Sequence, residues 1–420
     1  MIKSSRLCRI MIKDIKTKIS ELNIDFDYEA YWEIIYLILL AFFVGMRFLL
    51  STMFTIYWPK YFYRTLTVIG VVLVLMHLML AKDIKKKEIL AMLVVTFVFM
   101  MSHYVSGYDF LVDLLILILG AYRVNFRNIL KTYIAVWSVL LVVTIIGAMT
   151  GLAENLVYYQ GEGGERVRMA LGICYPTDLA AYVVFLMFTY VCVRDEYITY
   201  LEIGVMAVLA GAVYYITDAR TDFIVMEMTA FATLFIKKIS QKHKYILENK
   251  IIKIMYYIIP VMVCTISWWI TAIFTYENAF LTKLNDGFIS NRLSMGKQAI
   301  DDYGITLFGK YVIEMGYGGS TDVNKPYFFI DSSYISIGIK YGIIMLILFM
   351  IFTLYSIKKV MKKQKYLWII MLIMVSLQSF MEHHMIQYWY NVYILLIFAE
   401  VNKSESYKDD QEKIINLNLL

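Results

Sequence analysis

The chain has 420 residues, of which 60% are apolar and 18% charged, and its formal net charge at pH 7 is +6. A soluble domain of this size could not cover its surface with so few charged residues, so the composition predicts an integral membrane protein. The basic excess matches what the positive-inside rule places in cytoplasmic loops, so no nucleic-acid partner is expected. The cysteines have no paired spacing, and neither disulfides nor a metal site is expected. They are Cys8, Cys174, Cys192 and Cys264.

Twelve apolar runs follow one another along the chain. Most have the length of about 17 to 25 residues that crosses a hydrocarbon core of about 30 Å. They are apolar all round rather than alternating, so each predicts a helix and the expected fold is all-α. The run at 108–122 is the weakest prediction, because it is short and contains Asp113. The runs lie near 31–51, 65–81, 89–105, 108–122, 131–151, 175–193, 197–217, 222–236, 254–275, 332–356, 366–381 and 387–400.

The distribution of lysine and arginine predicts the orientation. The basic clusters of the N-terminal tail and of the connections after the second, fourth, eighth and tenth runs all share one side if both termini are cytoplasmic. This topology gives a cytoplasmic tail (1–30), one transmembrane domain (31–400) and a second cytoplasmic tail (401–420). It places the longest connection, 276–331, outside, between the ninth and tenth helices. No cleavable signal peptide is expected, because the basic N-terminal stretch lacks an apolar segment followed by a cleavage site.

Four arginines depart from this pattern, because they lie on the outer side beside apolar runs: Arg166, Arg168, Arg220 and Arg292. An arginine at membrane depth costs about 2.5–3.5 kcal/mol, and its planar guanidinium binds phosphate oxygens with two hydrogen bonds. Since three separate connections contribute, we expect a shared site for a lipid-linked phosphate or pyrophosphate. The alternative is that each arginine pairs with a nearby acid or reaches lipid headgroups. The nearby acids are Glu165, Asp218, Asp222 and Asp286.

Four segments of the chain, the last two of which belong together, carry a family resemblance. Residues 166–188 read RVRMALGICYPTDLAAYVVFLMF, and residues 215–228 read YITDARTDFIVMEM. Residues 291–318 read NRLSMGKQAIDDYGITLFGKYVIEMGYG, and residues 330–349 read IDSSYISIGIKYGIIMLILF. These segments resemble, in order, three parts of bacterial O-antigen polymerases and ligases. The parts are the arginine and "G-F-x-H/Y-P-N" turn after the fifth span, the "S-R-T-x-x" turn between spans seven and eight, and the arginine-containing large loop with its following helix.

The resemblance implies a Wzy-type polysaccharide polymerase in the bacterial cytoplasmic (inner) membrane. Such an enzyme transfers a growing glycan from undecaprenyl pyrophosphate to a lipid-linked repeat unit, in the synthesis of O-antigen, capsule or exopolysaccharide. It uses no nucleotide sugar, metal or other cofactor. Its partners are membrane lipids, the lipid-linked oligosaccharide and, in the same pathway, a flippase and a chain-length regulator. By resemblance, Arg168, Arg220 and Arg292 stabilise the departing pyrophosphate, with Arg166 in reserve.

The general base is less well defined by the sequence. Ligases of the family place a His-Asn pair where the large loop meets the tenth span, whereas this chain has Asp331 followed by two serines. This departure favours the polymerase branch. Asp331 is therefore a candidate base or acceptor-orienting group, although an aspartate before a helix is as often an N-cap. His383 and His384, after the eleventh run, are the other candidates.

Further candidates lie near the same loop. Lys340 falls inside the tenth run, where a charge must face protein or water; it either binds pyrophosphate or extends to the interface. Tyr327, Phe328 and Phe329 precede Asp331 and are candidate sugar contacts.

Two alternative functions remain open. A ligase that moves a finished glycan to another acceptor shares the fold and the leaving group. A lipid-linked oligosaccharide flippase or another twelve-helix transporter has a similar number of spans, but a carrier with two repeats should have a long central link. Here the central link, 194–197, is short and the longest loop is off-centre, which favours the transferase.

Overall fold

The computed structural model describes residues 28–55, 60–160, 165–287, 289–322 and 325–401. Most of the two predicted cytoplasmic tails, 1–27 and 402–420, lies outside the described residues. Eight described helices are long and apolar enough to cross a membrane, which supports an all-α, polytopic membrane protein. They are α2 (Tyr28–Leu49), α3 (Lys60–Leu80), α4 (Lys86–Ser106), α6 (Phe126–Met149), α7 (Pro176–Arg194), α8 (Tyr200–Thr217), α11 (Lys250–Ala272) and α15 (Ile343–Met361).

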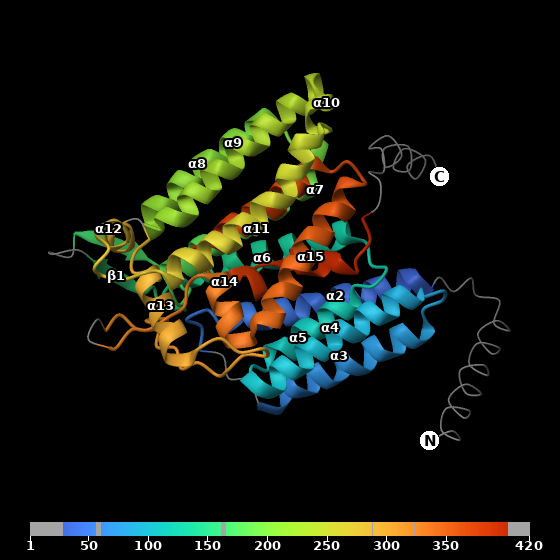
Figure 1. The fold of residues 1–420 in the computed structure, drawn as a ribbon, viewed down its shortest axis with the longest axis horizontal. Coiled ribbons are helices and arrows are strands. Elements are labelled where there is room, and N and C mark those ends of the chain that lie inside the picture. Colours follow the sequence, from blue (N-terminus) through green and yellow to red (C-terminus); the bar gives the residue numbers. More distant parts are fainter. Residues whose placement is uncertain (1–27, 56–59, 161–164, 288, 323–324, 402–420) are drawn as a thin grey trace.

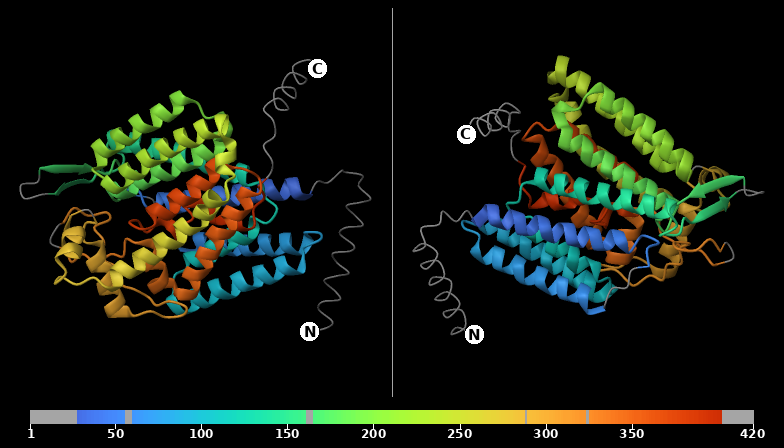
Figure 2. Two further views of the ribbon diagram at one scale, coloured as in Figure 1. Left: turned by 45° about the horizontal axis from the view of Figure 1, so that its top comes forward. Right: turned by 180° about the vertical axis from the view of Figure 1, so that it is seen from behind.

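The helices run between two ends of the bundle that carry different connections (Figures 1 and 2). One end carries the short helix α10 (Lys244–Leu247) and the basic connections, and contacts there include Arg123 to Glu29 and Lys365 to Asp195. The other end carries a β-hairpin and the helices of the long loop (Figure 1). The described basic connections thus lie at one end of the bundle. That this end is cytoplasmic stays a prediction.

Three further helices complete the bundle. α5 (Phe110–Gly120) and α16 (Tyr366–Gln378) are shorter than a membrane span, and almost all their residues are buried among other helices. Protein covers the ends of such interior helices, so they need not match the thickness of the lipid. The weak run at 108–122 is therefore an interior helix. α9 (Arg220–Lys242) is long enough to span but more polar, and it packs against α7, α8 and α16.

A buried ion pair explains the charge within α5. Asp113 lies 2.9 Å from Nη2 of Arg47 on α2, and its other oxygen accepts a hydrogen bond from Thr67 on α3 at 2.9 Å. The guanidinium also lies over the rings of Tyr63 and Trp389. Asp113 thus joins three helices through satisfied polar contacts, which is what a charge inside a membrane domain requires.

The predicted helix at 332–356 is not continuous. It consists of α14 (Ser333–Ser336), a π-helical turn η2 (Ile337–Tyr341) and α15, with a break at Gly342. Gly342 has φ +98°, and a Cβ there would lie 2.3 Å from the carbonyl oxygen of Leu307. The long loop supplies a hydrogen bond in place of one that the helix loses at the break: Ile343 N donates to Thr306 O at 3.0 Å. The prediction of one uninterrupted helix is wrong because the loop enters at this turn.

The predicted twelfth span, 387–400, is not a regular helix either. Its helical part is a 3₁₀ segment, η4 (Val392–Ile397), preceded by η3 (His384–Ile386). The segment still reaches the opposite end, where Glu400 N donates to Val124 O at 2.7 Å. Side chains satisfy its backbone, as where Tyr133 donates to Tyr390 O at 2.6 Å. Irregular backbone at this depth is tolerated because the segment is buried in protein rather than exposed to lipid.

The connection between α6 and α7 forms an antiparallel hairpin, β1 (Val157–Gln160) and β2 (Arg166–Met169). Residues two apart in a strand face the same side, so Arg166 and Arg168 share a face while Val167 points away and is exposed. The alternation in R-V-R-M is the pattern of a short strand.

Candidate functional site

The long loop places Arg292 at the first position of α13 (Arg292–Tyr303), after the short helix α12 (Ala279–Asp286). The start of α13 is fixed by the fully buried Asn285, whose Oδ1 accepts from Leu293 N at 3.1 Å and from Ser294 N at 3.0 Å. These are backbone donors that a helix start otherwise leaves unpaired. The side chain of Arg292 therefore leaves a rigid helix end.

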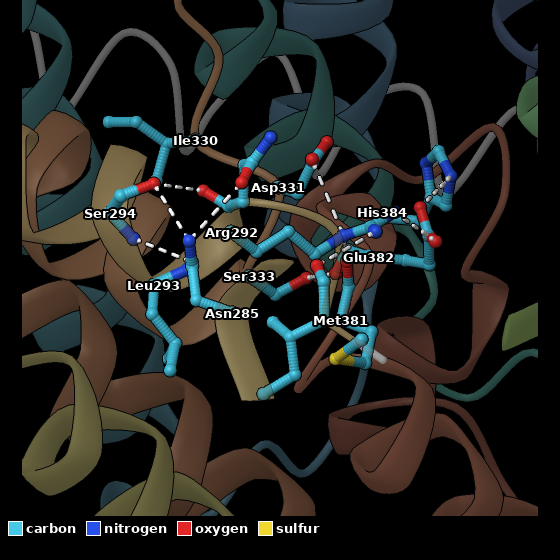
Figure 3. A network of polar contacts seen from close by, with 12 residues as sticks. Asn285, Arg292, Leu293, Ser294, Ile330, Asp331, Ser333, Met381, Glu382 and His384 are labelled. Atoms are coloured by element: carbon cyan, nitrogen blue, oxygen red, sulfur yellow. Dashed lines mark hydrogen bonds and ion pairs between the residues drawn. The ribbon is translucent and has the colours of Figure 1, made fainter. Parts of the chain in front are cut away.

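Arg292 lies between two carboxylates (Figure 3). Its Nη2 donates to Glu382 Oε1 at 2.9 Å, and its Nε lies 3.3 Å from Asp331 Oδ2. The same Nε donates to Met381 O at 2.7 Å. Arg292 and Asp331, both named from the sequence, thus meet, and Glu382 joins them from the turn after α16.

Backbone contacts hold the two acid-bearing segments together. Ser333 N donates to Ser379 O at 3.0 Å, and Ser333 Oγ donates to Glu382 O at 2.5 Å and accepts from Met385 N at 3.1 Å. The N-cap of α14 is Ser332 rather than Asp331. The side chain of Asp331 is therefore directed to Arg292 and does not act as a helix cap.

The two candidate histidines lie in the same cluster. His384 is 1% exposed; its Nδ1 is 3.0 Å from Gln387 Oε1, and its Nε2 is 4.0 Å from Glu382 Oε2. The ring of His383 is 4.2 Å from that of His384 and 4.8 Å from that of Phe329. His384 Nε2 and His383 Nδ1 are buried without a hydrogen-bond partner among the described residues.

Two further aspartates belong to the site. Asp222, on α9, is fully buried, and one of its oxygens accepts from Gln378 Nε2 at 3.1 Å. Asp178, on α7, offers a carboxylate oxygen within 4.8 Å of a nitrogen of each of His383 and His384. Asp178 was not among the residues predicted from the sequence, and Asp222 was predicted only as a salt-bridge partner. Each is a carboxylate in the first turn of its helix.

Burial controls the proton affinities in the cluster. It raises the pKa of Asp331 although Arg292 acts in the opposite direction, and it raises the pKa of Glu382 well above its ordinary value, with help from neighbouring carboxylates. Burial lowers the pKa of His384 to about 4, aided by Arg292 and opposed by the Gln387 hydrogen bond. The pKa of His383 is also well below its ordinary value, through burial and then His384. Both imidazoles are therefore neutral at pH 7 and can accept a proton or bind a cation.

The remaining predicted arginines divide into two groups. Arg168 is buried, donates from Nε to Thr217 O at 2.9 Å, and, like Arg292, interacts electrostatically with Asp222. It therefore lies beside the cluster. Arg166 donates to Asp218 Oδ2 at 2.6 Å. The side chain of Arg220 is 61% exposed and 4.0 Å from the same aspartate. These two arginines form a separate, more exposed group, as the salt-bridge alternative predicts.

Lys340 lies next to the cluster and does not extend to the surface. It is buried, and its Nζ is 2.7 Å from Glu314 Oε2 of the long loop and 5.8 Å from the centre of the Phe329 ring. The same ring of Phe329 contacts His383, so Lys340 and the histidine flank one aromatic side chain.

The three candidate sugar contacts have different surroundings. The ring of Tyr327 stacks on that of Tyr317 at 4.8 Å, and Phe329 borders the cluster. Phe328 instead packs in an apolar core under the long loop, with Ala299 and Val312. We therefore retain Tyr327 and Phe329 and remove Phe328 from the candidate site.

An apolar cavity of about 570 Å³ lies between α6, α7 and α8. It extends from Glu202, near the start of α8, to Leu171 and Thr217. Its walls are almost entirely aliphatic, with Val205 and Met206 among the lining residues. Arg168 lies at the Thr217 end of the cavity, because the carbonyl of Thr217 accepts the hydrogen bond from this arginine.

No protein-family model matches the chain. No curated protein and no solved structure is significantly similar to it.

Proposed function

We propose that this protein is a membrane glycosyltransferase that polymerises a polysaccharide from lipid-pyrophosphate-linked repeat units at the outer face of the cytoplasmic membrane. The observation that carries the proposal is the buried position of Arg292 between Asp331 and Glu382. The long loop supplies Arg292 and Asp331, at the end of the bundle opposite the basic connections (Figure 1). An arginine beside acids and neutral histidines combines an anion-binding group with proton acceptors.

The chemistry divides between these groups. In glycan transfer, the bond between the anomeric carbon and the pyrophosphate oxygen breaks, and negative charge develops on the lipid pyrophosphate. Arg292, with Arg168 beside it, stabilises that charge. The acceptor hydroxyl of the second lipid-linked unit attacks the anomeric carbon and loses its proton to a base. Asp331 and His384 are the candidate bases, because each lies in the cluster of Arg292 and has an atom that can take the proton of an acceptor hydroxyl.

The apolar cavity between α6, α7 and α8 suits the lipid part of the donor. Its aliphatic walls match a polyisoprenoid chain, and Arg168 at its outer end matches a phosphate. A lipid chain in this cavity would therefore direct its headgroup toward the acidic cluster. A ligase acting on another acceptor would use the same groups, so the polymerase differs from it only in the second substrate.

One observation favours a second candidate, a proton-coupled flippase of lipid-linked oligosaccharide. Buried carboxylates lie beside a helix broken at Gly342, and both features are common in transporters. We place it second because the long loop supplies Arg292 to the site, whereas transport requires no such cover over the substrate.

Replacing Arg292 with alanine, or with lysine to retain the charge, tests the proposal. The readout is the length distribution of surface glycan in a strain whose own gene carries the substitution, with protein level measured by immunoblot. We expect long chains to disappear while single repeats persist, and Arg220→Ala to leave chain length unchanged. Chains of normal length in both Arg292 variants would remove this residue from the site. Absence of any repeat at the surface would support the flippase.

A further inference from the structure

The acidic cluster has more negative than positive charge. Four carboxylates gather there, from Asp178, Asp222, Asp331 and Glu382, and they interact electrostatically with one another. The arginines beside them are Arg168 and Arg292. Lys340 is already paired with Glu314 and brings no net charge. A buried excess of two formal charges requires either protons or a cation, because uncompensated carboxylates are costly away from water.

Three side chains of the cluster bring potential metal-binding atoms close together. One carboxylate oxygen of Asp178 and one nitrogen from each of His383 and His384 all lie within 4.8 Å of one another. Asp331, Glu382 and His383 form a second set with the same spacing. Asp178 comes from the first turn of α7 and the histidines from the turn after α16, so two rigid elements bring the groups together.

The hydrogen bonding of His384 is compatible with metal ligation. Gln387 Oε1 can only accept, so the contact at 3.0 Å places the proton of His384 on Nδ1. The lone pair is then on Nε2, which is buried and has no hydrogen-bond partner among the described residues. A metal-bound histidine typically donates its other ring N–H to such an oxygen, which fixes the ring and its tautomer. His383 Nδ1 is a second buried nitrogen without a partner among the described residues.

We propose that Asp178, His383 and His384 form a binding site for a divalent transition-metal ion such as Zn²⁺. Two imidazoles and one carboxylate are a donor set that suits such ions. Three protein ligands leave one position for water or a substrate oxygen. Oε2 of Glu382 lies 4.0 Å from Nε2 of His384, and its Oε1 accepts from Arg292. An ion here would offset the excess charge, in contrast to the metal-free chemistry that the family resemblance implies. The site is argued from geometry and charge alone and does not rest on the proposed transferase activity.

Metal retention by the full-length protein tests this site. The protein is purified in detergent through a histidine-free affinity tag, stripped with a chelator, incubated with Zn²⁺ or Co²⁺ and passed through a gel-filtration column. We expect stoichiometric retention of Zn²⁺ and, with Co²⁺, the intense visible absorption of a four-coordinate site. Loss of an outer partner of a metal ligand costs about 10–100-fold in affinity. The variants His384→Gln and Asp178→Asn each remove a direct ligand, so each should lose at least this much affinity for the metal ion.

The matched control is His243→Gln, which removes an exposed histidine outside the cluster and should retain the wild-type metal content. Gel-filtration profiles and thermal unfolding show whether each variant is folded. The site is refuted if the wild-type protein holds no more Zn²⁺ or Co²⁺ than a folded His383→Gln/His384→Gln variant. Since the readout is bound metal, this result leaves glycan transfer to be judged separately.

Discussion

Arg292 and Glu382 are 90 positions apart in the sequence, yet Nη2 of Arg292 donates to Oε1 of Glu382 at 2.9 Å. The contact joins α13 of the long loop to the turn after α16. Both side chains are largely buried, and Asp331 shares the same guanidinium. This pair therefore fixes the loop over the cluster and positions Arg292, to which we assign the stabilisation of the leaving pyrophosphate.

We predict that the Arg292–Glu382 pair is strongly coupled in stability. Removing one partner of a buried ion pair costs about 3–5 kcal/mol, because the other charge stays buried without compensation. Arg292→Met should therefore lower the thermal unfolding temperature in detergent. Glu382→Gln in the same chain should recover part of the loss. The control is Arg220→Ala, whose exposed pair is worth about 0–1 kcal/mol. If Arg292→Met unfolds at the wild-type temperature, the pair is not coupled as the structure indicates.

We predict that Gly342 tolerates no side chain. Its φ of +98° is unfavourable for alanine, and the new Cβ would lie 2.3 Å from Leu307 O. Gly342→Ala should destabilise the protein by at least about 1–3 kcal/mol and displace the loop from α15. Gly211→Ala, in α8, is the control: no atom lies within 4 Å of its added Cβ. It should be neutral or stabilising by up to about 1 kcal/mol. Equal effects in both variants would contradict the close contact at Gly342.

Blocking the apolar cavity should impair use of the lipid-linked donor. Val205 and Val208 are both exposed on α8, but only Val205 is among the residues that line the cavity. Val205→Trp should therefore shorten or abolish polymerised glycan at normal protein level, whereas Val208→Trp should not. The measurement is the length distribution of surface glycan. Equal glycan from the two variants would show that the donor lipid does not occupy this cavity.

The orientation of the bundle is also testable. We expect the long loop outside and the basic end inside. In a chain whose four natural cysteines are replaced by alanine, Lys325→Cys should react with a membrane-impermeant maleimide on intact cells. Lys242→Cys, at the end of α9, should react only after permeabilisation. The reverse result would place Arg292 and Asp331 on the cytoplasmic side and remove the basis for the proposed function.

The site could be predicted in part. Arg292 was identifiable as an arginine on the expected outer side, and Asp331 by its position where the long loop meets the tenth run; the structure brings them together. Glu382 could not be connected to Arg292 from the sequence, because no local pattern relates two segments 90 positions apart. Arg220 was placed with Arg292 on sequence grounds, yet its side chain points to solvent and Asp218. Proximity to a membrane boundary does not determine the direction of a side chain.

The amino-acid sequence by itself determined that the chain is helical and membrane-embedded, where most helices lie, and which connections are basic. These properties follow from local composition and from the length that crosses a bilayer. Only the tertiary structure decided that 332–356 breaks at Gly342 and that 387–400 reaches the opposite end without a regular helix. It also decided that Asp222 and Glu382 interact with Arg292, and Asp178 with Glu382. The reason is physical: irregular backbone and buried charge are stable only where distant segments supply hydrogen bonds and counter-charges, and no local sequence pattern encodes those segments.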